Sequence, residues 1–324
     1  MAPDLPSYDD LPIRPDLPAG SAWGVWGDDD PLGCLNLLTT ERTLRGLGLA
    51  PRGAVFALNL EAELPSPPLF NRSAFEHRIN GLGSPVSRDD ELHAWNTQSS
   101  SQWDSLRHVR SPHGFWNNLD ETALGIHHFA RKGIVCRAVL ADVARWREAQ
   151  GRPLRPDAAD PIEPDDVTAT LEAQGVEIEQ GDVLLIRTGW VAWYRTLDQA
   201  ARTALAGSLQ APGLRPGRPT AQLLWDLHIA AVAADNPSLE VWPPGALSSS
   251  EERSAIRADP ERGLELFVHL ALLPLLGLPI GELWDLDALA ADCASDGVYE
   301  FLFTSAPLNL QSGVASPPNA LAVK

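Results

Sequence analysis

Three short apolar runs, separated by stretches with helical patterning, constrain the fold of this chain most strongly. They lie at 133–140 (GIVCRAVL), 181–190 (GDVLLIRTGW) and 229–234 (IAAVAA). Runs of this length and composition are typical of strands, and the second is typical of a buried one. Helices are predicted at 220–227 and 259–273. Because strand and helix signals alternate without a fixed period, the sequence predicts a mixed α/β fold and no repeat architecture.

Acidic residues dominate the charge of the chain. Its 324 residues include 43 Asp and Glu against 25 Lys and Arg, so the formal net charge is −18. This balance argues against binding to nucleic-acid backbones or to anionic membranes, since both need a basic face. The longest apolar run, 266–280, is interrupted by His269, Pro274 and Pro279. It falls short of the roughly 18 residues that a membrane span needs. We therefore expect neither a nucleic acid nor a membrane as partner.

The cysteines are few and far apart. Cys34, Cys136 and Cys293 form no Cys-x-x-Cys or Cys/His zinc spacing, and their odd number does not suit a disulfide framework. The first residues, MAPDLPSYDD, lack the pattern of a secretory signal. These observations predict a cytoplasmic location.

Proline marks the organisation of the chain. Residues 1–22 are predicted to form an extended arm that covers its own chain or reaches a partner subunit, because prolines recur at positions 3, 6, 12, 15 and 18. Residues 23–324 are predicted to form a single domain. Within it, the proline- and aspartate-rich segment 150–166 is interpreted as a surface loop, although its composition also suits a linker. The segment 62–92 is predicted to be a long loop of the kind that often covers a binding site.

The segment Asn96–His108 (NTQSSSQWDSLRH) carries the most informative polar pattern. If it begins as a strand, Gln98, Ser100, Gln102 and Asp104 share one face, and a turn then brings His108 toward them. Such a convergent polar surface suits chemistry. The alternative is the solvated outer face of an edge strand.

A histidine and a glutamate near the end of the chain add to this surface. His269 lies in a predicted helix that is apolar almost all round, so its imidazole needs a buried partner. A satisfied core histidine is the alternative interpretation. Glu282 follows thirteen residues later. Together with Asp104 and His108, these two residues offer oxygen and imidazole ligands for a metal and a general base.

Several segments along the chain carry a family resemblance. The chain resembles the cyclase superfamily that includes bacterial kynurenine formamidase and isatin hydrolase, on the segments WGDDDPLGCLNLLT, GDVLLIRTGW, DNPSLE, HLALLPLLGLPIGE and TSAPLNLQSGVASPPNALAV. The resemblance implies a single α/β domain of the swivelling β/β/α type, with a barrel-like sheet and peripheral helices. It also implies a homodimer or homotetramer.

The signature of this superfamily, His-x-Gly-Thr-His-x-Asp-x-Pro-x-His, falls on residues 98–108 with two departures. Asp104 and His108 match, whereas the two metal-binding histidines are Gln98 and Gln102. The resemblance implies that Asp104, His269 and Glu282 hold the metal. Amide oxygens are weak, neutral ligands, so the two glutamines reduce the affinity for zinc. One divalent ion (Mn, Mg or Zn, with Ca as a further hard ion) and a metal-free site both stay open.

The resemblance implies a hydrolase that opens a cyclic or formyl amide, or a lactone, of a small aromatic substrate. His108 would be the general acid/base, and Asp104 and Glu282 would position or activate water. Gln98 and Gln102 would polarise the carbonyl or hold an ion. Alternatives are a metal-independent cyclase or lyase acting on a polyketide-like or other reactive carbonyl compound, and a binding protein without activity.

Two further interpretations concern aromatic and charged side chains. Trp103, inside the signature, is predicted to wall the substrate pocket together with Trp95. Arg187 ends a buried strand, where a structural ion pair is favoured over the binding of a substrate anion.

Overall fold

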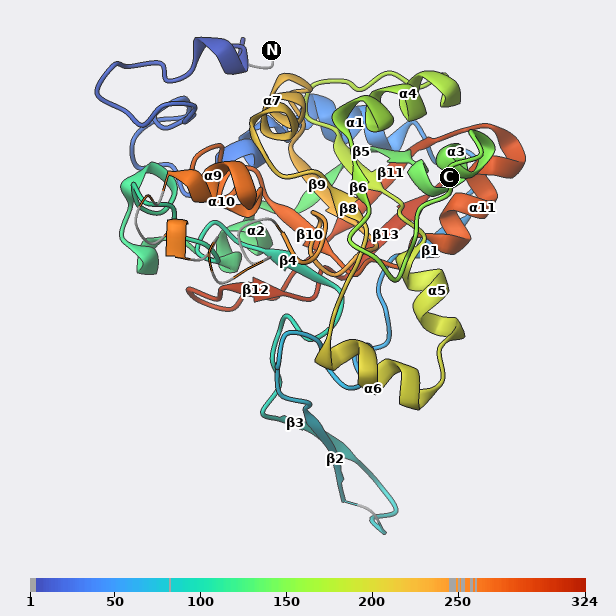
Figure 1. Cartoon of the computed structure of the whole chain (residues 1–324). Helices are drawn as coiled ribbons and strands as arrows, with labels where there is room; N and C mark the ends of the chain where they lie inside the picture. Colours follow the sequence, from blue (N-terminus) through green and yellow to red (C-terminus); the bar gives the residue numbers. More distant parts are fainter. Residues whose placement is uncertain are drawn as a thin grey trace.

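Strands from both ends of the chain form one sheet in the computed structural model (Figure 1). The structure describes residues 4–81, 83–244, 249, 251, 254–256, 259 and 261–324. Among these residues the sheet has nine strands in the order β1-β13-β11-β5-β7-β9-β10-β4-β12. Their bounds are β1 Val55–Ala57, β4 Gln102–Asp104, β5 Ile134–Ala141, β7 Val183–Ile186, β9 Ala231–Ala234, β10 Ile280–Glu282, β11 Glu300–Ser305, β12 Ala315–Ser316 and β13 Ala320–Val323. The sheet is curled and carries helices around it, which confirms the predicted α/β fold with a barrel-like sheet and peripheral helices.

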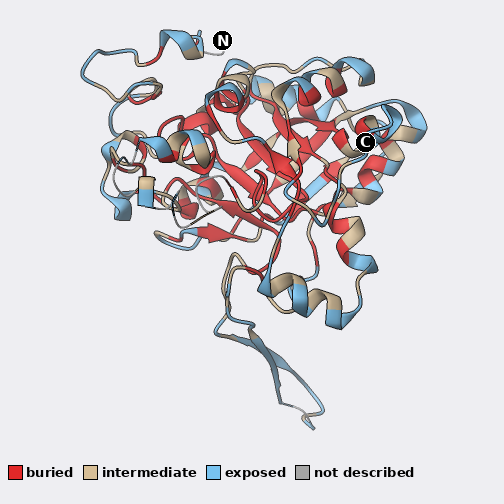
Figure 2. Ribbon diagram, in the orientation of Figure 1, coloured by how far each residue is buried: buried red, intermediate tan, exposed pale blue. Residues whose placement is uncertain are grey.

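The centre of the sheet is parallel. Strands β5, β7, β9 and β10 pair in parallel, and the other pairings are antiparallel. Parallel strands are normally covered on both faces, which explains why β7 (VLLI) and β9 (AVAA) are apolar at every position. Figure 2 shows this buried centre. The three strands predicted at 133–140, 181–190 and 229–234 are confirmed as β5, β7 and β9.

Helices surround the sheet and most are short. Their bounds are α1 Thr40–Leu47, α2 Ile126–Lys132, α3 Val143–Ala149, α4 Pro164–Gln174, α5 Trp190–Thr196, α6 Gln199–Gly207, α7 Arg218–Asp226, α9 Arg262–Leu266, α10 His269–Leu272 and α11 Asp287–Asp296, with 3-10 turns at Tyr8–Asp10, Gly33–Leu37, Trp116–Asn118 and Glu121–Ala123. The helix predicted at 220–227 is confirmed as α7. Thr39 caps α1 by accepting a hydrogen bond from the backbone N–H of Arg42.

A hairpin projects from the body of the molecule (Figures 1 and 2). It consists of β2 (Glu76–Asn80) and β3 (Asp89–His93), and every residue of both strands is exposed except the half-buried His93. The segment 62–92 was predicted to be a loop. The segments EHRIN and DDELH carry polar residues on both faces. They therefore lack the alternation of apolar and polar side chains that signals a strand. A separate two-stranded ribbon joins β6 (Pro161–Ile162) to β8 (Gly213–Leu214).

The proline-rich arm lies against its own chain. The backbone N–H of Tyr8 donates to Asp226, and the indole of Trp225 donates to the carbonyl oxygen of Pro6. The backbone N–H of Ala22 donates to the carbonyl of Leu275. Residues 1–22 were predicted either to cover their own chain or to reach a partner subunit. The described part of this arm, from residue 4, covers the surface of its own chain.

The strand expected from Asn96 onward is much shorter than the pattern indicates. Only Gln102–Asp104 form β4, and the residues before it make bends. Serine hydroxyls here bond to backbone carbonyls, namely Ser99 to Asn96, Ser100 to Glu61 and Ser101 to Leu283. These side-chain bonds compete with strand pairing. Ser100 therefore does not join the polar face that Gln102 and Asp104 share.

The helix expected at 259–273 is broken in the middle. Phe267 adopts an extended conformation between α9 and α10, and residue 260 lies outside the described residues. The Phe267 ring stacks on the imidazole of His269, with centroids 5.0 Å apart. His269 thus begins a short helix instead of lying inside a long one, and this break turns its side chain toward the sheet.

The last residue of the chain is fixed in the fold. Strand β13 lies between β1 and β11, and the ammonium of Lys324 contacts the carboxylates of Asp292 and Asp296 at 3.0 and 2.8 Å. The side chain of Lys324 is only 4% exposed. Among the described residues, no helix has the length and apolarity that crossing a membrane requires.

Candidate active site

Two neighbouring strands place the centre of the site. In the antiparallel pair β4–β10, Gln102 lies opposite Glu282 and Asp104 lies opposite Ile280. Directly opposite residues share a face, so Gln102, Asp104 and Glu282 all point to the same side of the sheet. The amide nitrogen of Gln102 is 2.5 Å from Oε2 of Glu282, and all three side chains are buried.

The segments on either side of β4 complete this cluster. The amide nitrogen of Gln98 is 2.9 Å from Oδ1 of Asp104 and 3.3 Å from Nδ1 of His108. The turn after β4 therefore brings His108 back to the polar face, as the sequence predicts. Its side chain is 25% exposed, so it lies at the rim while Asp104 lies at the floor.

His269 is held between two carboxylates. Its Nδ1 is 2.9 Å from Oε2 of Glu240, and its Nε2 is 3.1 Å from Oε1 of Glu282. Burial favours a lower pKa for His269, but the adjacent carboxylates of Glu240 and Glu282 outweigh it and raise the pKa well above 6.5. Gly213 lets the chain approach Glu240, since a Cβ at Gly213 would lie 2.3 Å from the carbonyl carbon of Glu240. Glu240 thus orients the ring of His269 in the way that carboxylates orient metal-binding histidines.

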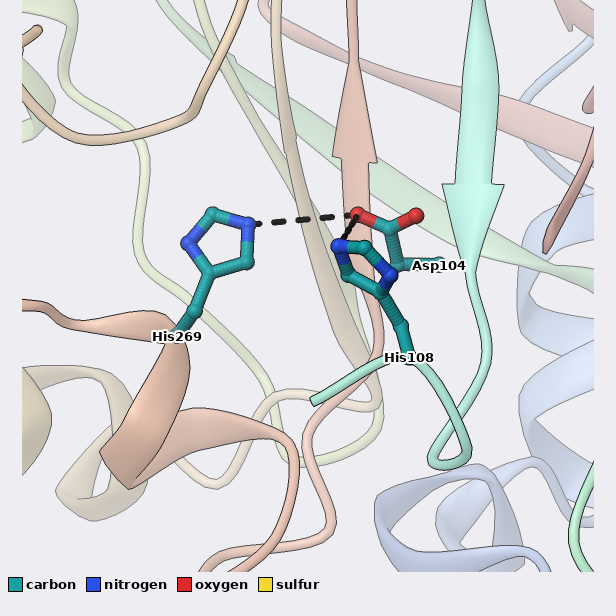
Figure 3. A group of neighbouring side chains, drawn as sticks. All are labelled: Asp104, His108 and His269. Atoms are coloured by element: carbon teal, nitrogen blue, oxygen red, sulfur yellow. Dashed lines mark ion pairs between the residues drawn. The ribbon is translucent and has the colours of Figure 1, made fainter. Parts of the chain in front are cut away.

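The same side chains fit a divalent metal ion. Oδ2 of Asp104 is buried and has no hydrogen-bond partner within the described part of the chain. It lies 3.9 Å from Nε2 of both His108 and His269, which is too long for a hydrogen bond (Figure 3). One carboxylate oxygen and two imidazole nitrogens thus converge within 4.8 Å of one another. This donor set suits Zn or Mn. The sequence predicts Asp104, His269 and Glu282 as the metal ligands. The geometry instead groups His108 with Asp104 and His269. Glu282 lies beside this group and is hydrogen-bonded to His269.

Burial shifts the acid–base properties of two further groups. It lowers the pKa of His108 below 6.5, against the opposing charge of Asp104. Burial, helped by the neighbouring Asp104 carboxylate, raises the pKa of Glu282 to about 7. A buried carboxyl group that changes protonation near neutral pH, beside a histidine at the pocket rim, is typical of acid–base catalysis.

A small, partly aromatic pocket opens above these groups. Its volume is about 220 Å³, and its walls include Phe70, Trp242 and Phe267 beside His108, His269 and Glu282. The rings of Phe70 and Trp242 pack edge to face, with centroids 4.8 Å apart. Ligand pockets usually measure about 300–1,000 Å³. This one therefore suits a substrate of one or two rings.

A larger cavity of about 470 Å³ lies between the N-terminal arm and α9. Its described walls include Tyr8, Arg218 and Glu265, and Arg218 is paired with Asp9 at 2.8 Å. The cluster of Asp104, His108 and His269 borders the smaller pocket instead, so that pocket is the candidate active site.

Trp103 does not belong to the pocket, which corrects the role predicted for it. Because side chains alternate along a strand, Trp103 points to the opposite face of β4 from Gln102 and Asp104. It is fully buried, its indole donates to Oγ of Ser305 at 2.9 Å, and it packs edge to face on Trp284. Trp95 is half-buried and lies outside the pocket lining.

Arg187 makes the structural ion pair that the sequence favours. Its guanidinium contacts the carboxylates of Asp142 and Asp287, each at 2.9 Å.

Seven residues of the site have no role in the sequence-based prediction: Phe70, Arg72, Pro237, Ser238, Glu240, Trp242 and Phe267. They come from segments far apart in the chain, and only the fold brings them together. Glu240 carried one signal, because it ends the segment DNPSLE on which the family resemblance rests.

Comparison with known sequences and structures places the chain in a family. The Cyclase family model, described as "Putative cyclase", matches residues 26–241. That range includes Asp104, His108 and Glu240 and ends before His269 and Glu282. None of the curated proteins matches the chain.

Solved structures extend the match to nearly the whole chain. A crystal structure of "a novel cyclase" is 31% identical, covers 94% of this chain and 99% of its own, and has a TM-score of 0.79. Isatin hydrolase A from Labrenzia aggregata, bound to benzyl benzoate, is 16% identical, covers 83% of this chain and 93% of its own, and has a TM-score of 0.56. Isatin hydrolase A from Ralstonia solanacearum is also 16% identical, with 88% and 98% covered and a TM-score of 0.55. The chain therefore belongs to the cyclase family, whose fold it shares.

Proposed function

We propose that this protein is a hydrolase that opens a cyclic or formyl amide, or a lactone, of a small aromatic compound. One observation carries the proposal: Gln98, Gln102, Asp104, His108 and Glu282 form one hydrogen-bonded cluster, and two of them, His108 and Glu282, line a pocket with aromatic walls. The isatin hydrolases with this fold support it. One is bound to the aromatic ester benzyl benzoate and another to a product analogue, thioisatinate.

The proposed reaction adds water to a substrate carbonyl. His108, at the rim, takes a proton from the water as its oxygen bonds to the carbonyl carbon. For this step the amides of Gln98 and Gln102, which bond to Asp104 and Glu282 in the free protein, turn to the carbonyl oxygen and stabilise the negative charge that develops on it. The carbon–nitrogen or carbon–oxygen bond then breaks, and His108 returns the proton to the leaving atom. Asp104 and Glu282 orient the water and the imidazole.

Asp104 and His269 would hold a divalent ion, with His108 left free to move the proton, and such an ion would supply polarisation of the carbonyl. Gln98 and Gln102 occupy the positions beside Asp104 where imidazoles would raise the affinity for zinc.

The double change Gln98→His/Gln102→His is expected to tighten zinc binding by at least about tenfold, or roughly 1.4 kcal/mol. Imidazole nitrogen binds zinc more strongly than an amide oxygen does. Titration against a chromophoric chelator measures the affinity. The matched control is Gln150→His/Gln199→His, which adds two imidazoles at exposed positions. Equal zinc affinities for the two double variants would contradict the placement of residues 98 and 102 at a metal site.

The runner-up is a metal-independent cyclase or lyase that acts on a polyketide-like or other reactive carbonyl compound. The observation that favours it is the presence of amides instead of imidazoles at positions 98 and 102 beside Asp104, since amide donors and His108 suffice for carbonyl chemistry without a metal and without net addition of water.

Turnover in oxygen-18 water tests the proposed function. The substrates are isatin (a cyclic amide), formanilide (a formyl amide) and phthalide (an aromatic lactone), and metal content is measured on the same samples. We expect at least one of the three substrates to be hydrolysed, with one heavy oxygen in the acid product. Product formation without heavy oxygen would support the cyclase or lyase instead. No turnover by metal-free and by Mn-, Mg- or Zn-loaded protein would overturn the hydrolase and favour a binding protein.

We also propose that the protein is a homo-oligomer in the cytoplasm. The three cysteines are free and buried, which suits a reducing compartment. An isolated two-stranded ribbon is marginally stable, so the projecting β2–β3 hairpin is well suited to contact a second copy of the chain. Ile79 and Leu92 share one face of the hairpin and are 47% and 45% exposed.

Ile79→Glu is therefore expected to shift the protein toward a 35 kDa monomer at micromolar concentration, because the new charge would be buried between copies. Light scattering coupled to size-exclusion chromatography gives the mass. Asn80→Glu makes the same charge change on the opposite face and is expected to leave the mass unaltered. A monomeric native protein would refute the proposal.

A further inference from the structure

We propose that Arg72 is an anion-binding residue of the pocket and that the ligand is an aromatic carboxylate. This inference rests on the proposed function and adds to it the chemical class of the substrate or product. Arg72 lines the pocket together with Phe70, Trp242, His108 and Glu282.

The guanidinium of Arg72 is held in place but only partly used. Its carbon lies 4.9 Å from the centroid of the Phe70 ring. One terminal nitrogen, Nη1, donates to the backbone carbonyl of Gln98 and approaches Oε1 of Gln102 at 3.4 Å. Within the described part of the chain, Nε and Nη2 have no hydrogen-bond partner. A positioned guanidinium with free N–H groups presents the fork that binds a carboxylate.

The charge of Arg72 acts on the Glu282 carboxyl, but Arg72 forms no direct ion pair within the described part of the chain. Most arginines of this acidic protein pair with carboxylates, as Arg137 does with Asp182 and Glu300. Among the described residues, no carboxylate lies within ion-pair distance of Arg72. The nearest buried carboxylate cluster is already occupied, since Glu282 and Glu240 both contact His269. A protein with a net charge of −18 repels anions in general. An unpaired arginine in the pocket is therefore what allows an anionic ligand to bind there.

The neighbours of Arg72 define the rest of the ligand. Phe70 and Trp242 form an edge-to-face pair beside it, which suits contact with a flat ring. A ring between these walls with its carboxylate on Arg72 is an aromatic carboxylate such as benzoate. In the proposed reaction this group is either part of the substrate or the acid released by ring opening.

Calorimetric titration with benzoate and with its neutral isostere benzamide tests the inference without turnover. We expect the native protein to bind benzoate more tightly than benzamide. Arg72→Gln is expected to weaken benzoate binding about 10- to 100-fold, the range for a lost charged hydrogen bond, and to leave benzamide unaffected. Arg72→Lys keeps the charge but loses the forked geometry of the guanidinium. Its affinity for benzoate should lie between that of the native protein and that of Arg72→Gln. The matched control Arg155→Gln removes an arginine that is 68% exposed outside the pocket.

Equal affinities for benzoate and benzamide, no binding of either, or a benzoate preference that survives Arg72→Gln would each overturn the inference. Kinetics with formanilide and 2-formamidobenzoate distinguish the two sources of the carboxylate. A higher KM of Arg72→Gln for the second compound alone assigns the carboxylate to the substrate. Relief of product inhibition at unchanged KM assigns it to the product. If benzoate binding depends on Arg72 while no substrate is turned over, this inference holds and the proposed function fails.

Discussion

Replacement of His108 by alanine is expected to lower kcat by about 10²- to 10⁴-fold, the usual contribution of one general acid–base group. The ring lies at the rim of the pocket, with Nδ1 next to the Gln98 amide and Nε2 facing Asp104. Because its pKa is lowered by burial, His108 is neutral at pH 7 and ready to accept a proton. Steady-state kinetics on the best of the three test substrates measure the loss.

His113→Ala provides the matched control for this experiment. His113 lies five residues further along, and its imidazole pairs with Glu261 at 2.9 Å outside the pocket lining. The kcat of the His113→Ala variant should equal that of the native protein. If His108→Ala retains native turnover while Asp104→Ala loses it, His108 is structural and the carboxylates carry the reaction.

Trp103→Ala is expected to destabilise the protein by about 3–5 kcal/mol, the cost of removing a large aromatic side chain from a packed core. Trp103 is fully buried, and its ring centroid lies 4.7 Å from that of Trp284 on the face of β4 that points away from the pocket. Unfolding in guanidinium chloride measures the change. The KM of the folded protein should stay near the native value.

Two comparisons make this second result specific. Trp103→Phe keeps most of the volume and should lose less stability than Trp103→Ala. Trp95→Ala removes a half-buried tryptophan of the same region and should also cost less. A raised KM for Trp103→Ala with unaltered stability would instead return Trp103 to the pocket wall.

The central strands could be predicted from the sequence because each is apolar over its whole length, apart from Arg137 in β5, and is bounded by polar or glycine residues. The strand at Gln102–Asp104 was overestimated, since serine hydroxyls that bond to distant carbonyls give no local signal. The hairpin 76–93 was missed because solvent reaches both of its faces. Its strands therefore need no alternation of apolar and polar side chains, and the sequence carries no such pattern.

The floor of the site could be predicted because its residues lie within one short segment and one family signature. Gln98, Asp104 and His108 are within ten positions of one another, and the structure brings them together. The walls could be predicted only in part: Phe70 lies in the segment 62–92, which was expected to cover a binding site, whereas Trp242 lies in no segment predicted to border the site. Phe70 and Trp242 contact each other across 172 residues of chain, and a single apolar side chain carries no sign of where it packs.

The burial of Lys324 gives the protein an internal reporter of opening. Lys132 and Lys324 are its only lysines; Lys132 is exposed, whereas the amine of Lys324 is enclosed by Asp292, Asp296 and the carbonyl of Val298. A reagent that acylates amines will therefore modify the Lys132 side chain at once. It will reach Lys324 only in molecules in which β13 has detached from α11. The rate of the second modification, read by mass spectrometry, thus measures how often this edge of the native protein unfolds locally.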